Sequence, residues 1–297
     1  MRIIRYLHEH SKATLAAVTN EGKVYPLPQE GLIELIQQAN EQNVSPLSFV
    51  EFTISKSKPI PYSVEDLSLL VPIEAEEVWA SGVTYERSRD ARNYEATGGK
   101  LDATTFYDKI YEAERPEIFF KSTAARTVGP GQDVYIRSDS NWQIPEPEVG
   151  IVINRDGEIL GYTIGNDMSC RDIEGENPLY LPQAKMWKNS CSIGPAILLA
   201  ESVEDPYNFD ITCRIYRNDE LKVEGKANTN QLKRKFDELI SFLIRDNEIF
   251  DGTVLLTGTC IIPSNDFTLL DGDQIEIEVS NIGVLKNSVK LPNKILV

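Results

Sequence analysis

The sequence predicts an α+β chain with a mostly-β mixed roll or barrel as its main body and a small N-terminal α/β domain. Short β-branched runs, bounded by turn residues, recur between residues 78 and 285. Helical patterns are limited to a few segments, with apolar spacing at 31–41 and from 230 onward and alternating charge at 86–94. Many strands with few helices, and no internal repeat, favour an α+β or mostly-β fold.

Residues 1–71 are expected to form the small N-terminal domain. Strand-like runs cover 3–7 and 13–18, and Glu21-Gly22 marks a turn. A short amphipathic helix is predicted over 31–41, with apolar residues at 32, 33, 35 and 36. The polar, proline-containing segment 55–61 is a plausible linker to the main body, residues 72–297.

The main body is predicted to open with a strand over 77–85 that runs into a helix over 86–94. Residues 96–100 form a loose, glycine-containing segment that we expect to be a mobile lid. A buried strand over 118–122 follows, and a hairpin turns at Asn218-Asp219. Helical spacing returns from residue 230, and short strands over 254–259, 274–279 and 282–285 end the chain.

Residues 144–167 are expected to hold the chemistry. Two β-branched runs flank Asp156-Gly157, a strong hairpin signal. Strand side chains alternate between faces, so Glu146 and Glu148 share one face. If Asp156-Gly157 is a two-residue turn, the numbers of opposed residues sum to 313, and Asp167 lies across from Glu146 on that face.

Three carboxylates brought together in this way repel one another, and a divalent cation removes the repulsion. Ligation by oxygen alone favours Mg²⁺, or Mn²⁺ or Ca²⁺, over Zn²⁺. The alternative is a solvated acidic rim on an edge strand, which Pro145 and Pro147 also fit. A register slip of one residue would turn Asp167 away from the glutamates.

The composition is that of a globular protein, with 297 residues, of which 41% are hydrophobic and 26% charged. A net charge of −16 without a Lys/Arg cluster argues against nucleic acid and anionic membranes as partners. No apolar run has membrane-spanning length, and the N-terminus turns polar too early for a signal peptide. The four scattered cysteines indicate reduced thiols and a cytoplasmic protein.

The chain has only two histidines, His8 and His10. A Ser/His/Asp or Cys/His device, or a histidine-ligated metal, would require one of them to reach the site from the N-terminus. Acid–base chemistry is therefore expected from Lys, Glu, Asp or Tyr.

The ordered motifs resemble the fumarylacetoacetate hydrolase superfamily from about residue 72 to the C-terminus. In that family an acidic trio at the positions of Glu146, Glu148 and Asp167 holds Mg²⁺ or a similar ion. The motifs that carry the resemblance are Ser81-Gly82-Val83-Thr84-Tyr85, Glu117-Ile118-Phe119-Phe120-Lys121, Glu146-Pro147-Glu148-Val149-Gly150, Gly161-Tyr162-Thr163-Ile164-Gly165-Asn166-Asp167, Arg171-Asp172, Ser192-Ile193-Gly194-Pro195, Thr257-Gly258-Thr259 and Ile282-Gly283-Val284-Leu285.

The sequence departs from the hydrolytic members at one motif. Those members resemble Asn-Tyr-x-x-His-x-x-Glu, a His–Glu pair that activates water, whereas this chain has Ser88 and Ala91 at the two positions. The version without the pair is similar to the 2-keto-3-deoxy-arabinonate (pentonate) dehydratase branch. In that branch a Lys at the position of Lys185 and a Glu at the position of Glu117 face the substrate.

The resemblance implies a Mg²⁺-dependent dehydratase of a 2-keto-3-deoxy sugar acid such as 2-keto-3-deoxy-D-arabinonate, giving 2,5-dioxopentanoate in pentose or sugar-acid breakdown. Lys185 and Glu117 would share the base and acid roles, in an order that stays open. A buried Lys185 beside a cation is expected to have a lowered pKa. A homo-oligomer, dimer or tetramer, is also implied.

Four further residues are expected to contact the substrate, and Arg171 with Asp172 is expected to form a structural pair. The expected contacts are Ser88, Lys121, Ser122 and Thr259, with a structural role as the open alternative for Lys121 and Ser122. Two other functions are left open. The first is a C–C hydrolase or decarboxylase of acylpyruvate-like diketo acids, against which the missing His–Glu pair argues. The second is a non-catalytic protein stabilised by a metal.

Overall fold

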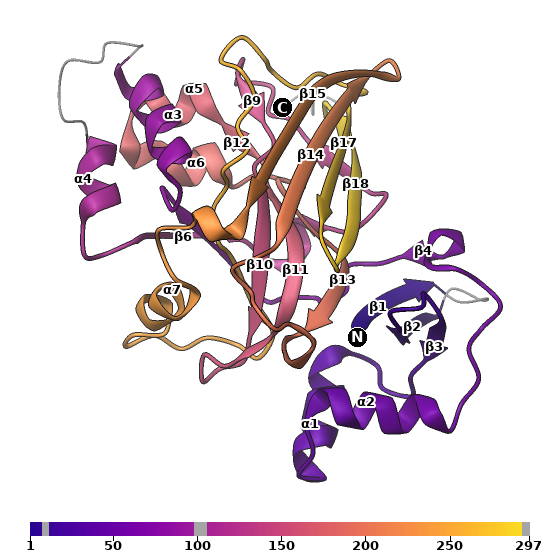
Figure 1. Ribbon diagram of the computed structural model, residues 1–297. Coiled ribbons are helices and arrows are strands. Elements are labelled where there is room, and N and C mark those ends of the chain that lie inside the picture. Colours follow the sequence, from indigo (N-terminus) through magenta and orange to yellow (C-terminus); the bar gives the residue numbers. More distant parts are fainter. Residues whose placement is uncertain (8–11, 98–105, 293–297) are drawn as a thin grey trace.

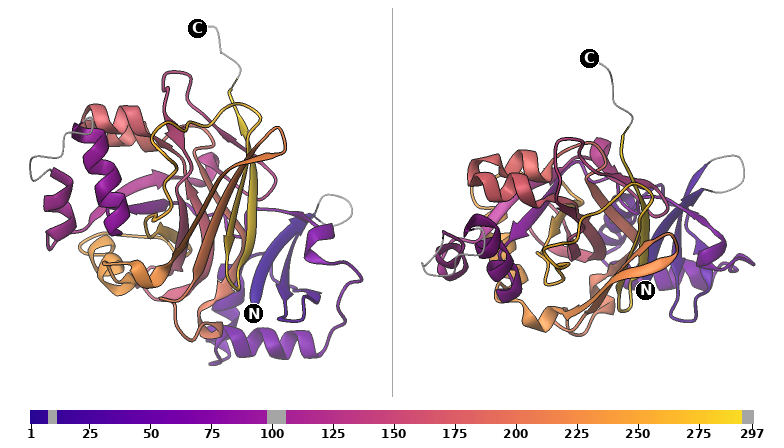
Figure 2. Two further views of the ribbon diagram at one scale, coloured as in Figure 1. Left: turned by 45° about the horizontal axis from the view of Figure 1, so that its top comes forward. Right: turned by 90° about the horizontal axis from the view of Figure 1, so that it is seen from above.

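The computed structural model describes residues 1–7, 12–97 and 106–292, and its strands form two large sheets (Figures 1 and 2). Sheet A has eleven strands, namely β1 (Arg2–Leu7), β2 (Ala13–Val18), β3 (Val24–Pro26), β4 (Ser68–Leu69), β5 (Val78–Gly82), β6 (Glu117–Ser122), β7 (Thr127–Val128), β10 (Pro147–Ile153), β11 (Ile159–Asp167), β13 (Cys191–Leu199) and β16 (Thr253–Leu256). Sheet B has five, namely β8 (Asp133–Tyr135), β14 (Asp210–Arg217), β15 (Glu220–Asn228), β17 (Gln274–Val279) and β18 (Gly283–Lys290). The short strands β9 (Gln143–Ile144) and β12 (Ser169–Cys170) pair with each other.

The α-helices among the described residues are α1 (Leu32–Glu41), α2 (Pro46–Ser55), α3 (Glu86–Thr97), α4 (Phe106–Glu112), α5 (Arg171–Glu176), α6 (Leu181–Lys185) and α7 (Phe236–Leu243). The predicted α+β class with predominant strands is confirmed. The described strands stay in open sheets, so the roll of the prediction applies and the barrel does not.

The main path of sheet A runs β3-β2-β1-β13-β11-β10-β16-β5-β6, and both of its faces are covered. On one face, Val149 and Ile151 of β10 belong to a core shared with sheet B and α7. On the other face, Val152 packs in a second core with α1, α2 and β16. Burial on both faces explains why every residue of β10 and β13 is buried.

The N-terminal strands continue sheet A, because β1 pairs antiparallel with β13 at Arg2↔Leu198 and Ile3↔Ile197. Helix α1 packs its Leu32, Leu35 and Ile36 into the core that also holds residues of the main body. Figure 1 shows this N-terminal part at the lower right, away from helices α3 to α6. The boundary between residues 71 and 72 stays a prediction.

Most of the predicted elements are present with small shifts at their ends. The helix predicted over 86–94 is α3 and extends to Thr97, and the hairpin at Asn218-Asp219 joins β14 to β15 with both turn residues at positive φ. The helix predicted from residue 230 begins only at Phe236.

Helix α2 escaped the sequence analysis, although Ser45 caps it and Pro46 occupies its first position. None of the helices in the described part of the chain has the length and apolar composition that a bilayer crossing requires. His8, His10 and residues 98–100 of the predicted lid lie outside the described residues.

Candidate active site

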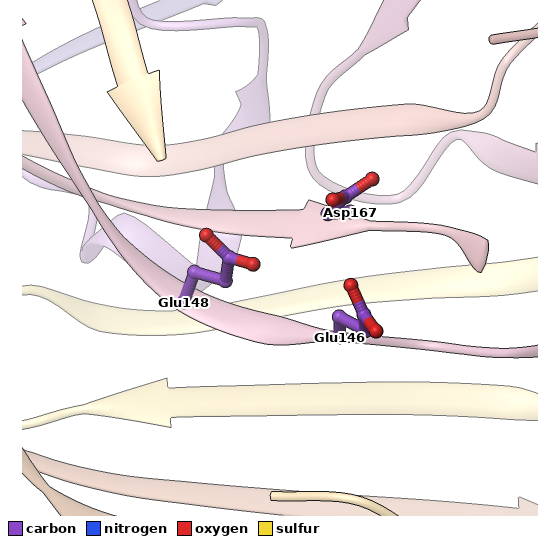
Figure 3. A group of neighbouring side chains, drawn as sticks. All are labelled: Glu146, Glu148 and Asp167. Carbon is purple, nitrogen blue, oxygen red and sulfur yellow. The ribbon is translucent and has the colours of Figure 1, made fainter. Parts of the chain in front are cut away.

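The hairpin of β10 and β11 brings the three predicted carboxylates together (Figure 3). Glu146 directly precedes β10, Glu148 lies in β10, and Asp167 ends β11. One carboxylate oxygen of each residue lies within 4.8 Å of those of the other two. All three are buried, with exposures of 5%, 1% and 1%. The alternative of a solvated acidic rim on an edge strand is therefore wrong, because β10 and β11 lie inside sheet A.

The predicted register is confirmed, although the predicted two-residue turn is wrong. Opposed residue numbers sum to 313 from Pro147↔Asn166 to Val152↔Gly161. The turn is a three-residue loop closed by the hydrogen bond from the Asn154 N–H to the Glu158 carbonyl, with Gly157 at φ +81°. Leu160 is then an extra, bulged residue on β11. The bulge shifts the pairing by one residue, which compensates for the extra residue in the turn and restores the predicted register.

Glu148 is oriented by the backbone of the Thr257-Gly258-Thr259 motif. The Gly258 N–H donates to Glu148 Oε2 at 2.6 Å. Gly258 has φ +94°, and a Cβ there would lie 1.9 Å from Thr84 Oγ1. Because Thr84 donates to the Thr257 carbonyl at 2.8 Å, the chain passes too close to Thr84 for any residue other than glycine.

Three cations contact the carboxylate trio. Lys185 Nζ lies 2.5 Å from Glu146 Oε2 and 3.2 Å from Asp167 Oδ2. Lys121 Nζ lies 2.5 Å from Asp167 Oδ1, and the Arg171 guanidinium lies 3.1 Å from Glu146 Oε1. Lys185 also donates to Ser169 Oγ at 2.6 Å. The cation predicted as catalytic is thus in direct contact with two of the predicted metal ligands.

A second shell of charges surrounds these contacts and was not predicted. Arg92 of α3 pairs with Glu174 of α5, and Glu95 of α3 pairs with Arg171. Glu174 Oε1 lies 3.7 Å from Lys185 Nζ. The spacing of Arg92 and Glu95 on one helix, and of Arg171 and Glu174 on another, was a weak signal that both helices present charge to the same place.

The expected pairing of Arg171 with Asp172 is wrong. Arg171 reaches Glu95 and Glu146, whereas Asp172 accepts hydrogen bonds from Ser140 Oγ and from the Asn141 N–H, both at 2.6 Å. Neighbouring residues at the start of helix α5 point in different directions, so adjacency in sequence did not imply contact.

The environment moves the pKa values of the two glutamates in opposite directions. Burial disfavours the charge on Glu146, but Lys185, Arg171 and Arg92 outweigh it and lower the pKa of Glu146 to about 2. Burial raises the pKa of Glu148 well above its ordinary value, and the charges of Asp167 and Glu146 add to the effect.

The pKa of Lys185 is raised. Burial alone would lower it, but Asp167, Glu146 and Glu174 outweigh burial. The lowered pKa was predicted for Lys185 beside a bound cation and stays a prediction, because the nearest charges to Lys185 here are carboxylates.

The buried charges of this cluster do not cancel. Six carboxylates and four cations meet around the trio, which leaves a formal charge of −2 when all are ionised. The carboxylates are Glu95, Glu117, Glu146, Glu148, Asp167 and Glu174, and the cations are Arg92, Lys121, Arg171 and Lys185. One divalent cation would neutralise the cluster, and oxygen donors of this kind suit a hard ion such as Mg²⁺.

Glu117 lies at the edge of this cluster. Burial raises its pKa, and its Oε2 is closed to solvent with no hydrogen-bond partner among the described residues. A Cβ on Gly82 of the paired strand β5 would lie 2.3 Å from this oxygen. Glycine at position 82 therefore makes the space that the Glu117 carboxyl occupies.

A cavity of about 10 Å³ lies between the trio and α3, enough for an ion or one water molecule. Besides the trio, Ser88, Thr259 and Lys185 are among the residues that line it. Ser88 Oγ also donates to the Tyr85 carbonyl at 2.7 Å, and Thr259 Oγ1 donates to the Ile261 carbonyl at 3.2 Å.

Two other predicted substrate contacts lie away from this cavity. Lys121 is fully buried against Asp167, and Ser122 Oγ accepts from Thr127 Oγ1 at 3.0 Å. Neither residue is part of the cavity wall. The structure thus brings Ser88, Thr259 and Lys185 to the trio and places Ser122 in a separate hydrogen bond.

Comparison with known proteins adds three findings. The sequence pattern described as fumarylacetoacetate (FAA) hydrolase C-terminal matches residues 88–290. The 2-dehydro-3-deoxy-D-arabinonate dehydratase of Saccharolobus solfataricus is 48% identical over 234 residues, 79% of this chain and 78% of that protein. The probable 2-keto-3-deoxyxylonate dehydratase of Haloferax volcanii is 47% identical over 224 residues, 75% of each chain.

A solved structure is similar over nearly the whole chain. It is described as 2-keto-3-deoxy-D-arabinonate dehydratase complexed with magnesium and 2,5-dioxopentanoate. It has a TM-score of 0.83 and 37% sequence identity, and the similarity covers 99% of this chain and 100% of that chain.

Proposed function

Because this chain belongs to the fumarylacetoacetate hydrolase family, we propose that it is a Mg²⁺-dependent dehydratase of a 2-keto-3-deoxy sugar acid. The proposed substrate is 2-keto-3-deoxy-D-arabinonate and the product 2,5-dioxopentanoate. The observation that carries the proposal is the buried trio with Lys185 Nζ in contact with two of its members. The dehydratases named above, which are similar over three quarters of the chain, support it.

Glu146, Glu148 and Asp167 would hold the ion. Their oxygens converge, they are shielded from water, and the surrounding cluster has more carboxylates than cations. Mg²⁺ is the preferred candidate, with Mn²⁺ and Ca²⁺ as the alternatives. When bound, such an ion supplies Lewis acidity to the C2 keto oxygen and makes the C3 proton easier to remove.

Lys185 would accept the C3 proton in this proposal. Its ammonium is held by Glu146 and Asp167. Were these carboxylates to ligate the ion, they would no longer pair with the ammonium, and the neutral amine of Lys185 would be favoured. Ser169 Oγ, 2.6 Å from Nζ, would keep the amine in place.

Glu117 would give a proton to the departing C4 hydroxyl. Its raised pKa favours the protonated carboxyl, and its Oε2 has no hydrogen-bond partner among the described residues. Loss of the C3 proton and the C4 hydroxyl as water leaves an enone. Transfer of a C5 proton to C3 then gives a C4=C5 enol, and transfer of the enol hydroxyl proton to C4 gives the aldehyde of 2,5-dioxopentanoate. Ser88 and Thr259, which line the cavity, are the proposed substrate contacts.

The test incubates the protein, with Mg²⁺ and with a chelator, with 2-keto-3-deoxy-D-arabinonate and separately with an acylpyruvate. We expect 2,5-dioxopentanoate from the sugar acid, in an amount that depends on Mg²⁺. Cleavage of the acylpyruvate into two carbon fragments without dehydration of the sugar acid would instead support a C–C hydrolase. Binding of Mg²⁺ without turnover of either substrate would support a non-catalytic protein.

We also propose a cytoplasmic homo-oligomer. The four cysteines are free thiols, which suits a reducing compartment. Leu179, between helices α5 and α6, is 83% exposed, and Tyr180 beside it is also exposed, a combination that association of subunits would cover. Light scattering coupled to size-exclusion chromatography distinguishes a dimer or tetramer from a monomer.

A further inference from the structure

Lys121 has its ammonium group surrounded by protein oxygens. Its Nζ lies 2.5 Å from Asp167 Oδ1, donates to the Met168 carbonyl at 2.9 Å and donates to the Lys185 carbonyl. A lysine ammonium has three N–H donors, and three oxygens lie within hydrogen-bonding distance. The side chain is completely buried and forms no part of the cavity wall. Two hydrogen bonds and an ion pair thus direct the ammonium toward protein oxygens, and its side chain does not line the cavity.

The three oxygens come from two segments of the proposed site, the end of β11 with a metal ligand and the end of α6 with the proposed base. Asp167 is a proposed metal ligand at the end of β11, and Met168 follows it. The third oxygen is the backbone carbonyl of Lys185, which ends α6 and carries the proposed base. A cation at the C-terminal end of a helix satisfies carbonyls that the helix leaves without partners. One ammonium therefore ties a metal ligand to the backbone of the proposed base.

Lys121 also selects between the two oxygens of Asp167. It contacts Oδ1, whereas Lys185 approaches Oδ2 at 3.2 Å. The two backbone carbonyls hold Lys121 against Oδ1, so Oδ2 is the oxygen that would become available to an ion. Mg²⁺ demands strict ligand geometry, and a partner that fixes the orientation of a ligand contributes to its affinity.

We propose that Lys121 is a positioning residue, which orients Asp167 for the metal and fixes the end of α6 for Lys185 without touching the substrate. This assignment replaces the substrate contact predicted from the sequence, and it rests on the proposed function only for its catalytic consequence. Its consequence for metal binding stands independently of which substrate the protein uses.

The test compares Lys121→Met and Lys121→Arg with the matched control Lys188→Met, which changes an exposed lysine three residues beyond Lys185. Calorimetric titration with Mg²⁺ should show a Kd raised about 10–100-fold for Lys121→Met. Lys121→Arg keeps the charge but spreads its donors over a planar group, so we expect a smaller loss. Lys188→Met should bind Mg²⁺ like the unmodified protein.

Kinetics at saturating Mg²⁺ separate positioning from substrate contact. A positioning role predicts a lower kcat with KM for the sugar acid changed less than about threefold, because only interactions with the substrate set its ground-state affinity. An unchanged or tighter Mg²⁺ affinity in Lys121→Met, or a raised KM at unchanged kcat, would overturn the proposal. If Lys121→Met does not fold, which circular dichroism reports, the same two measurements on Lys121→Arg decide. Absence of turnover in the unmodified protein would refute the proposed function, while the Mg²⁺ titrations would still test Lys121.

Discussion

Glu146 and Glu148 lie two residues apart on the same face, yet we expect their substitutions to affect stability in opposite directions. Glu146 is stabilised as an anion by Lys185 and Arg171, and its pKa falls to about 2. Among the described residues no lysine or arginine forms an ion pair with Glu148, and its pKa is raised. Glu146→Gln and Glu148→Gln each keep the shape of the side chain and remove its titratable group, so the pair isolates the electrostatic contribution.

The expected loss in the free energy of unfolding for Glu146→Gln follows from the pKa of Glu146. A fall from 4.5 to about 2 corresponds to about 3 kcal/mol of the free energy of unfolding at neutral pH. Loss of one partner of a buried ion pair costs about 3–5 kcal/mol, which agrees. At about 2 °C per kcal/mol for a chain of this size, Glu146→Gln in a chelator should lower Tm by about 6 °C.

Glu148→Gln in the same chelator should leave Tm unchanged or raise it. The glutamine carbonyl can still accept the Gly258 N–H, and a buried carboxyl whose raised pKa disfavours the folded state at neutral pH has been removed. Addition of Mg²⁺ at about 100 times its Kd should stabilise the unmodified protein by about 2.7 kcal/mol and should stabilise neither variant.

Thermal unfolding followed by circular dichroism, with chelator or with Mg²⁺, measures both effects. The folded-state pKa of Glu146 is depressed, so its contribution is present above pH 4.5 and is lost as the pH falls toward 2. The difference in Tm between Glu146→Gln and the unmodified protein should therefore become smaller as the pH falls from 4.5 toward 2. Equal losses of stability for the two variants in chelator at neutral pH would refute the electrostatic distinction between the two glutamates.

Three other substitutions test the surroundings of the trio. Gly258→Ala should weaken Mg²⁺ binding about 10–100-fold in calorimetry, because its Cβ collides with Thr84 and displaces the N–H that orients Glu148. The control is Gly272→Ala, because Gly272 has a similar φ and a Cβ there would have no neighbour within 4 Å. Gly82→Ala should lower kcat while Mg²⁺ affinity is retained, since its Cβ displaces Glu117 and no ligand of the trio; unchanged turnover would contradict the role of Glu117. Burial raises the pKa of Glu95 to about 7 despite Arg171, so its stabilising contribution is lost as the pH rises from 4.5 to 7. Between pH 4.5 and 7, the free energy of unfolding of Glu95→Gln, measured with denaturant, should therefore rise by about 3 kcal/mol relative to that of the unmodified protein. Parallel dependences of the two free energies on pH would contradict this.

The sequence could place the trio because strand alternation is a local rule. Glu146 and Glu148 share a face whatever the turn, and the predicted pairing, in which opposed residue numbers sum to 313, places Asp167 on the same face. The turn itself was mispredicted, and the bulge at Leu160 restored the predicted pairing. The register is set by burial on both faces of β10 and β11, which a one-residue slip would disrupt, rather than by the turn alone.

The charges around the trio could not be predicted in the same way. Arg92 and Glu95 lie in a charged helix that has the sequence of a solvated surface helix, and only the packing of α3 against α5 buries them. Lys121 had the same ambiguity, because the end of a strand does not say which oxygens surround an ammonium. Contacts between distant segments decided both cases, and the periodicity of one segment carries no information about them.

Glycines explain why so many charges can gather inside a sheet with both faces covered. Gly165 stands opposite Glu148 in the pairing of β10 with β11, and a Cβ there would lie 2.3 Å from Leu256 Cδ2. Gly82 leaves space for Glu117, and Gly258 brings a backbone N–H to Glu148. A Cβ at Gly82 would meet the Glu117 carboxyl, one at Gly258 would meet Thr84, and one at Gly165 would meet Leu256. The glycines thus let the backbone and neighbouring side chains approach closely around the carboxylates, and the cations of β6, α3, α5 and α6 supply counter-charge. The site is therefore held by ion pairs more than by side-chain packing, which is why its stability should respond to Mg²⁺ and to pH.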